Sequence, residues 1–253
     1  MVENKIPNIL TSELLTFILT TYNDGENMDG LYQDLIKSFS KKVLSFGLIG
    51  VDAGSSDNSV DILERLCPVL GPHNCDSQYV KLDRRPEEFK DLSKALNIGI
   101  DLAMLAGSQY ICWIHPDMKF FNEGRGVGWI EAQMQYLKDN PKVGKVSPEV
   151  EPSPEFGERP GHQCPWVLTA EVIEKLKKQD GYVFDEGYQL CGGYEDWDLC
   201  KRILDLGYKV MIAGKPRISH VSMGTRKKYD NNAAARFNAG LYQHKWGQSA
   251  PFV

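Results

Sequence analysis

The chain has 253 residues, of which 42% are hydrophobic and 25% are charged, a composition typical of a globular protein with a substantial core. The formal net charge of -5 provides no overall basic surface, so we expect no nucleic-acid partner. No apolar run approaches the roughly 18 residues of a membrane span, and residues 1–10 lack the zones of a signal peptide. The six cysteines form no CxxC pair, which favours free thiols and a cytoplasmic protein, either free or peripheral at a membrane surface.

The first 121 residues alternate between apolar runs and segments of helical periodicity. The apolar runs predict strands over residues 14–20, 46–51, 79–82 and 110–114, and the helical spacing predicts helices over 31–43, 60–66 and 89–105. This alternation is typical of an α/β protein with a largely parallel sheet and right-handed crossovers. No GxGxxG follows the first strand and no P-loop pattern occurs, which argues against dinucleotide and P-loop sites.

Residues 122–253 are less regular. Periodicity predicts helices over 129–137, 170–178, 195–206 and 233–246, and short apolar runs predict strands over 143–146, 208–213 and 217–221. Residues 151–164 are rich in Pro and Gly, so we expect a loop there. We expect a single domain over residues 1–253, divided into halves near 14–121 and 122–253, of which the first is typical of a nucleotide-binding α/β unit.

Polar side chains follow the first two predicted strands. Thr20 and Tyr22 come at the end of the first strand, where a hydroxyl and an aromatic face suit a ribose and a base. Asp52 ends the second strand, and its carboxylate can accept hydrogen bonds from a nucleobase imide or a ribose hydroxyl. An ordinary turn also explains residues 20–24, and Asp57 is suited to cap the helix that follows.

The fourth predicted strand ends in a compact group of polar residues. The stretch YICWIHPDMKFF, residues 110–121, passes from five mostly apolar residues into His115, Pro116 and Asp117. Pro and Asp are typical of a turn. An imidazole and a carboxylate at the carboxyl end of a strand also suit a metal site, because α/β sheets bind their ligands at that edge. Taken alone, this stretch leaves both interpretations open.

Three carboxylates crowd a predicted helix start in GGYEDWDLCKR, residues 192–202: Glu195, Asp196 and Asp198. Acidic residues in a first turn gain about 0.3–1 kcal/mol from the helix dipole, and Asp198 forms an i,i+4 pair with Arg202. Adjacent carboxylates after two glycines also suit a positioned general base. Structural and catalytic interpretations both remain open for this group.

Two basic residues stand at predicted element ends. Lys94, in SKALNIG, either reaches a phosphate or stays solvated on its helix. His220 ends an apolar strand and precedes a basic loop, which makes it a candidate metal ligand.

The order and spacing of these groups resemble those of glycosyltransferase family 2, whose members have the GT-A fold. The matching stretches are TFILTTYND, FGLIGVDAGSSDNSVDIL, SKALNIGIDLA, YICWIHPD, the FDE of residues 184–186, GGYEDWDLCKRILDLGYKV and ISH. Together they extend the resemblance over residues 14–247. None of these stretches is specific alone, and their common order carries the resemblance.

The resemblance implies a nucleotide-sugar-dependent glycosyltransferase and a role for each matching residue. The metal ligands are Asp117, at the second Asp of an Asp-x-Asp motif, and His220, and the ion is Mn²⁺ or Mg²⁺. Asp196 matches the catalytic base of the inverting members, and Arg226 falls in a basic loop that closes over the diphosphate. The nucleotide-sugar-binding candidates are Thr20, Tyr22, Asp52, Lys94, His115, Glu195 and Arg226.

Two positions depart from the pattern of the family. His115 replaces the first Asp of Asp-x-Asp, and Ala53 stands where many members carry a second Asp that reads the base. These departures keep open the alternative of a catalytically weak or inactive nucleotide-sugar-binding protein with the same fold. A sugar-nucleotide pyrophosphorylase is another alternative, but it would carry a Gly-rich, Arg-containing loop after the first strand, which residues 20–24 do not provide.

We therefore expect a metal-dependent, inverting enzyme that moves a sugar from a nucleotide-diphosphate sugar to an acceptor hydroxyl on a saccharide, glycan or glycoside, for example in polysaccharide biosynthesis. Residues 151–168 with Trp166, together with Tyr188 and Tyr194, carry aromatic faces that either stack on the acceptor or pack in the core. Lys245 and Trp246 either cover the site or pack the last helix.

Overall fold

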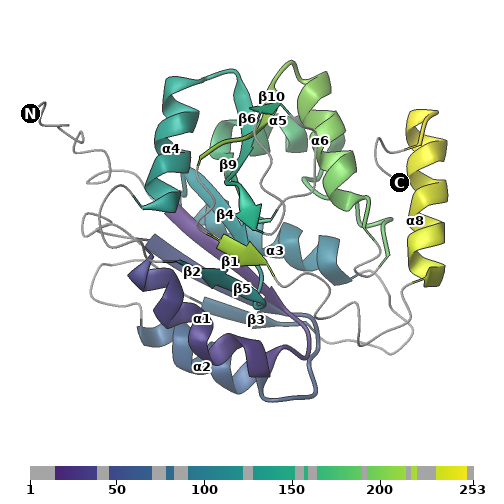
Figure 1. Cartoon of the computed structure of the whole chain (residues 1–253). Helices are drawn as coiled ribbons and strands as arrows, with labels where there is room; N and C mark the ends of the chain where they lie inside the picture. Colours follow the sequence, from purple (N-terminus) through teal and green to yellow (C-terminus); the bar gives the residue numbers. More distant parts are fainter. Residues whose placement is uncertain are drawn as a thin grey trace, which may run out of the picture.

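The computed structural model describes residues 15–38, 46–69, 78–82, 91–121, 128–151, 157–158, 164–189, 193–214, 218–220 and 232–249. Within these ranges, eight strands form the main sheet in the order β3-β2-β1-β4-β9-β6-β10-β8, and β5, β11 and β7 form a second sheet. Helices lie against both faces of the main sheet (Figure 1). In these same ranges, every helix is too short or too polar to cross a lipid bilayer.

The first half of the chain forms a parallel ladder. Its strands are β1 (Leu15–Thr21), β2 (Phe46–Asp52), β3 (Gln78–Lys81) and β4 (Tyr110–Ile114), and its helices are α1 (Gly25–Lys37), α2 (Ser59–Val69) and α3 (Asp91–Leu105). β1 lies between β2 and β4 and is parallel to both, while β2 is parallel to β3. Every residue of β1 is buried, as expected of a strand covered on both faces. The predicted strand–helix alternation of this half is confirmed.

The second half extends the same sheet. Its strands are β6 (Val143–Ser147), β8 (Gly157–Glu158), β9 (Trp166–Thr169) and β10 (Lys209–Ile212), and its helices are α4 (Trp129–Asp139), α5 (Ala170–Asp180), α6 (Glu195–Asp205) and α8 (Asn232–Trp246). β9 is antiparallel to both of its neighbours, β4 and β6. β9 is not among the predicted strands, because its four residues run directly into α5 without a turn signal. The loop predicted over residues 151–164 is also wrong in part, since β8 lies within it.

The second sheet joins three segments that are distant along the chain. Its strands are β5 (Met118–Phe120), β7 (Val150–Glu151) and β11 (Ile218–His220). β11 is parallel to β7 and antiparallel to β5, and its last residue, His220, pairs with Met118. The backbone of His220 therefore lies beside the turn that contains His115 and Asp117.

Successive side chains of β1 point to opposite faces of the main sheet, and different helices cover the two faces. Phe17 faces α4, because its ring centroid lies 6.3 Å from that of Trp129. Ile18 faces α3 on the opposite side, since a Cβ at Gly99 would lie 2.7 Å from Ile18 Cγ2. The close approach of α3 to β1 at this point requires the absence of a side chain at residue 99.

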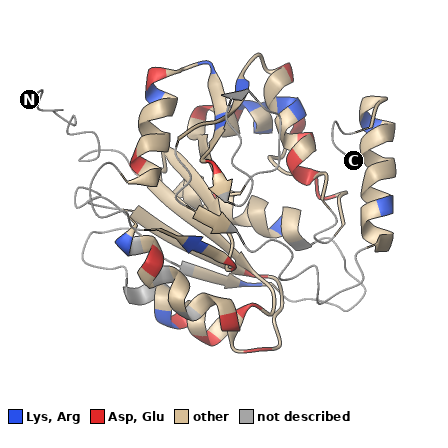
Figure 2. Ribbon diagram, viewed as in Figure 1, with Lys and Arg blue, Asp and Glu red and all other residues tan. Residues whose placement is uncertain are grey.

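The carboxyl ends of the parallel strands meet at one edge of the sheet. The register pairs Thr21 of β1 with Asp52 of β2, and Leu19 of β1 with Ile114 of β4. β6 and β10 run in the same direction as β4, because β9 is antiparallel to both β4 and β6 and β10 is parallel to β6. α6 leads into β10, so α6 begins at the edge where the parallel strands end. Acidic residues gather in the first turn of α6 (Figure 2). The edge therefore collects the polar residues that follow the strands, as the sequence predicted.

We expect Gly99→Ala to destabilise the fold, because the added methyl group would overpack the α3–β1 contact, at a cost of about 1–3 kcal/mol. Gly240→Ala in α8 is the matched control, since nothing lies within 4 Å of its Cβ and alanine in a helix is favoured over glycine by up to about 1 kcal/mol. Urea unfolding measures both free energies. A Gly99→Ala protein as stable as the wild type would contradict the close packing.

Candidate functional site

The turns after β1 and β2 are locked together by hydrogen bonds. Asn23 has a φ of 53°, a left-handed conformation that asparagine adopts more readily than most residues. Its backbone N–H donates to Ser55 Oγ at 2.8 Å, and its Oδ1 accepts from the Ser56 N–H at 2.8 Å. Asp57 accepts from the N–H of Ser59 and from that of Gly25, each at 3.0 Å. The predicted cap at Asp57 is confirmed, and it joins the starts of α1 and α2.

Asp52 has one carboxylate oxygen engaged in its own turn. The residue is fully buried, and its Oδ2 accepts from the N–H groups of Gly54 and Ser55 at 2.9 and 2.8 Å. Its Oδ1 is buried and accepts no hydrogen bond from the described residues. Because a buried polar oxygen ordinarily has a partner, Asp52 Oδ1 is suited to a donor group on a ligand.

Three other nucleotide-site candidates differ in their exposure. Thr20 is buried, and its Oγ1 accepts a hydrogen bond from Trp113 Nε1 at 3.0 Å. Tyr22 is partly buried in the turn after β1, and Lys94 is exposed in the first turns of α3. Thr20 therefore supports the strand ends, whereas Tyr22 and Lys94 have accessible surface.

Residues 115–117 form a turn between β4 and β5, so the turn predicted for this stretch is confirmed. The N–H of Met118 donates to the carbonyl oxygen of His115 at 3.3 Å. The imidazole of His115 lies against the indole of Trp113, with ring centroids 4.3 Å apart. Asp117 is partly buried in this turn. The turn stands at the edge where β4 ends, so it is also compatible with a ligand site.

Of the two candidate metal ligands, the structure describes the side chain of Asp117 but not that of His220. The backbone of His220 pairs with Met118, next to Asp117, but the His220 side chain lies outside the described part of the structure. Arg226 and the rest of its basic loop also lie outside the described residues. Among the described residues, no group of three or more His, Cys, Asp or Glu side chains forms a metal site.

The first turn of α6 holds the candidate base. It follows Gly193 and Tyr194, both with positive φ. Glu195 and Asp196 are buried, and Asp196 is 8% exposed. Asp196 Oδ1 is buried and accepts no hydrogen bond from the described residues. The positive end of the helix dipole stabilises a carboxylate at this position.

Cys164 connects the turn after β4 with the start of α6. It is a buried free thiol, and its Sγ lies 3.5 Å from the carbonyl oxygen of Trp113. Burial raises the pKa of Cys164 well above its ordinary value, and the negative charges of Asp196 and Asp117 contribute to this rise in pKa. The charges of both carboxylates therefore act on one thiol, although the residues are far apart in the sequence.

The amino-acid sequence matches the family model for glycosyl transferase family 2 over residues 16–188. The chain belongs to this family. The resemblance inferred from the motifs is confirmed, and the protein is a glycosyltransferase with the GT-A fold.

Solved structures of other transferases have the same fold. TarS from S. aureus (residues 1–349) aligns with a TM-score of 0.61 at 13% identity, covering 92% of this chain and 72% of that one. A mannosyltransferase from Pyrobaculum calidifontis aligns with a TM-score of 0.63 at 16% identity, covering 94% and 66%. This chain spans 44% of a longer TarS structure. These likenesses establish the fold of the family 2 transferase.

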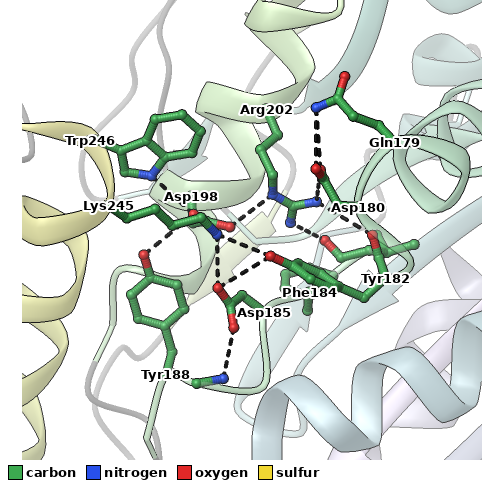
Figure 3. Close-up of polar contacts among 12 residues, drawn as sticks. Gln179, Asp180, Tyr182, Phe184, Asp185, Tyr188, Asp198, Arg202, Lys245 and Trp246 are labelled. Atoms are coloured by element: carbon green, nitrogen blue, oxygen red, sulfur yellow. Dashed lines mark hydrogen bonds and ion pairs between the residues drawn. The ribbon is translucent and has the colours of Figure 1, made fainter.

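A buried ion-pair cluster ties α6 of the transferase to α8 (Figure 3). Asp198 is fully buried and pairs with Arg202 at 2.9 Å and with Lys245 of α8 at 2.8 Å. Its Oδ1 also accepts from Trp246 Nε1 at 3.0 Å, and Lys245 continues to Asp185 at 2.8 Å. The predicted Asp198–Arg202 pair is confirmed. Lys245 and Trp246 pack the last helix against α6.

Two of the aromatic residues proposed for the acceptor belong to the interior. Trp166 is fully buried, with its ring 5.8 Å from Phe184 and 5.5 Å from Trp113. Tyr188 is also buried. An acceptor-stacking role for these two residues is therefore wrong, because neither has a free face. Tyr194 keeps intermediate exposure.

Two asparagines that are absent from the predicted site residues hold loops near the candidate site. Asn97 of α3 accepts from the N–H of Phe184 at 2.9 Å and donates to its carbonyl oxygen at 2.8 Å. Asn238 of α8 makes a similar set of bonds to Gln189. The stretch SKALNIG contains Asn97, but periodicity shows only its helix and not a partner in a distant loop.

Acid should weaken the attachment of α8. Burial raises the pKa of Asp185, but hydrogen bonds from Lys245 and the Gly187 N–H outweigh burial and hold the pKa below its ordinary value of 3.8. Because this pKa is lower in the folded state than in the unfolded chain, the stabilisation is present above pH 3.8 and is lost as the pH falls through the folded pKa.

We therefore expect the free energy of unfolding to fall more steeply below about pH 4 in the wild type than in Lys245→Met. Urea titrations between neutral and acid pH measure both profiles. Other carboxylates titrate in both proteins, so the difference between the profiles isolates the groups that Lys245 contacts. Parallel profiles would show that the Lys245–Asp185 pair does not stabilise the fold.

Proposed function

We propose that this family 2 transferase moves a sugar from a nucleotide-diphosphate sugar to an acceptor hydroxyl, with a divalent cation and inversion at the anomeric carbon. The observation that carries the proposal is Asp196, a buried carboxylate whose Oδ1 accepts no hydrogen bond from the described residues. A general base needs such an oxygen, because it must receive the acceptor proton. The charge of Asp196 acts on the same thiol as that of Asp117, the proposed metal ligand.

The donor would bind at the turns after β1, β2 and β4. Asp52 Oδ1 supports this proposal, since it is a buried acceptor that a base or ribose donor group would satisfy. Structures of TarS with UDP-GlcNAc and of the Pyrobaculum mannosyltransferase with GDP-Man support a nucleotide sugar as the donor. The proposed contacts are Tyr22, Asp52, Lys94, His115, Glu195 and Arg226. Thr20 would support them from the end of β1, where its Oγ1 accepts from Trp113 Nε1.

Asp117 and His220 are the proposed ligands of Mn²⁺ or Mg²⁺. Their backbones are neighbours through the pairing of β11 with β5, and a carboxylate with an imidazole suits such an ion when phosphate oxygens fill other positions. When bound, the cation would neutralise charge on the departing nucleoside diphosphate. The Pyrobaculum mannosyltransferase was solved with Mn²⁺, which supports the choice of a divalent metal.

Asp196 would accept the proton of the acceptor hydroxyl while the bond between the sugar and the diphosphate breaks. The acceptor oxygen attacks the anomeric carbon and forms the new C–O bond as the bond to the diphosphate oxygen breaks. The bonding electron pair leaves with the nucleoside diphosphate, and the hydroxyl proton passes to Asp196. A carboxylate is a weak base, and it suffices when the proton moves late in the step, because positive charge has by then developed on the attacking oxygen. Attack opposite the leaving group gives the inverted linkage.

We expect Asp196→Asn to lower kcat by about 10²–10⁴, because an amide cannot take up the proton. The dissociation constant of the nucleoside diphosphate should stay unchanged. Asp205→Asn is the control on the same helix, since Asp205 is exposed and pairs only with Lys201 among the described ion pairs. Transfer or slow hydrolysis of a nucleotide sugar measures kcat. Wild-type turnover in Asp196→Asn would contradict the role of Asp196 as the base. Retention of configuration at the anomeric carbon of the product would contradict the inverting mechanism.

Calorimetric titration of UDP, GDP, dTDP and CDP, each with Mn²⁺ and with a chelator, tests the donor site. We expect one nucleotide to bind tightly only with the metal, and Asp117→Asn to weaken that binding by removing a charged ligand. Glu174→Gln, an exposed carboxylate on α5, is the control. If no nucleotide binds under either condition, the donor site proposed here is wrong.

These measurements, together with an assay for nucleotide-sugar synthesis, separate the alternatives that the sequence left open. Metal-dependent binding without transfer or hydrolysis would favour an inactive nucleotide-sugar-binding protein, for which the replacement of Asp by His115 is the motivating observation. Formation of a nucleotide sugar from a sugar phosphate and a nucleoside triphosphate would favour a pyrophosphorylase.

A further inference from the structure

The candidate base is presented by a strained turn. Gly193 and Tyr194 have φ values of 80° and 79°, and Glu195 and Asp196 follow directly. Glycine adopts this left-handed conformation freely, whereas tyrosine does not, because its Cβ crowds the backbone. A residue in such a conformation persists only where the surrounding structure holds it. The direction in which Asp196 points therefore depends on what holds Tyr194.

The side chain of Asn238, in α8, holds the backbone on either side of residues 190–192. Asn238 is 0% exposed. Its Oδ1 accepts from the N–H of Gln189 at 2.8 Å, and its Nδ2 donates to the carbonyl oxygens of Gln189 and Gly193 at 3.0 and 2.9 Å. Both amide hydrogens are thus used on the backbone that leads into the strained turn.

Tyr242, one helical turn further along α8, packs on the strained residue Tyr194. Its ring is buried and lies 5.8 Å from the ring of Tyr194. Beyond it, Lys245 and Trp246 contact Asp198 in the first turn of α6 (Figure 3). One face of α8 therefore contacts Gly193, Tyr194 and Asp198, on both sides of Asp196.

We propose that Asn238 and Tyr242 are positioning residues for the catalytic base Asp196: α8 clamps the strained turn at residues 193–194 and so sets the direction of the carboxylate. This inference rests on the proposed role of Asp196. Asn238 and Tyr242 lie beyond residues 16–188, which match the family model, so the clamp is an inference from the contacts of this chain.

Asn238→Asp tests the clamp with little change in size. It keeps the acceptor for the Gln189 N–H and places a carboxylate oxygen against the two carbonyl oxygens that Nδ2 now satisfies. In the nucleotide-free protein, we expect amide hydrogen exchange in residues 193–200 to rise at least about tenfold. We expect kcat to fall by about 10–100-fold, as for a misplaced catalytic group. The dissociation constant of the nucleoside diphosphate and the KM of the donor should change less than about twofold.

Gln243→Glu is the matched control, because it makes the same change from amide to acid on an exposed position of α8. It should leave both exchange and kcat at wild-type values. If Asn238→Asp does not fold, Tyr242→Leu replaces it, since that change substitutes a smaller apolar side chain for the ring that packs on Tyr194. A purely structural role would lower stability without separating kcat from donor binding.

A folded variant of Asn238 or Tyr242 with wild-type exchange and wild-type kcat would overturn the clamp and leave the proposed function intact. A wild-type protein that turns over no nucleotide sugar would overturn the proposed function instead. In that case, faster exchange of residues 193–200 in Asn238→Asp would still support the clamp as the element that holds this turn.

Discussion

The parallel pairing of β1 with both β2 and β4 is the constraint on which the site depends. Adjacent parallel strands end at the same edge of a sheet, so the pairing brings the turn after Thr21, the carboxylate of Asp52 and the turn at His115 to one place. β1 is buried along its whole length, because helices cover both faces, and its side chains are therefore apolar or small. The charged groups of the candidate site follow the strand ends, at the edge where α/β proteins commonly bind ligands.

β9 connects the sheet edge proposed for the donor with the half of the chain that contains the proposed base on α6. The strand is antiparallel between β4 and β6, so it links the ladder of the first half to the strands of the second. Cys164 precedes it, and the charges of Asp117 and Asp196 both reach the Cys164 thiol. The proposed metal ligand in one half and the proposed base in the other thus act electrostatically on the same buried thiol.

Buried polar contacts set the geometry of the second half. Asp198 is a fully buried charge, which is tolerated because Arg202, Lys245 and Trp246 all donate to it. Asn97 and Asn238 satisfy the backbone of loops that lack strand partners. Apolar packing is not directional and permits several positions of these loops, whereas the hydrogen bonds are directional and specify one loop conformation. The C-terminal helix thereby belongs to the same unit as the start of α6.

The sequence by itself determined the strand–helix order of the first half and the positions of Asp52, Asp117 and Asp196, because periodicity and strand or helix ends are local properties of the chain. It also determined the family, through the order of its motifs. Only the tertiary structure decided that Trp166 is interior, that β9 is antiparallel between β4 and β6, and that Asn238 holds the turn before Asp196. Each of these depends on contacts between residues far apart in the chain, and no local pattern of apolar and polar residues encodes which distant backbone groups a buried side chain will meet.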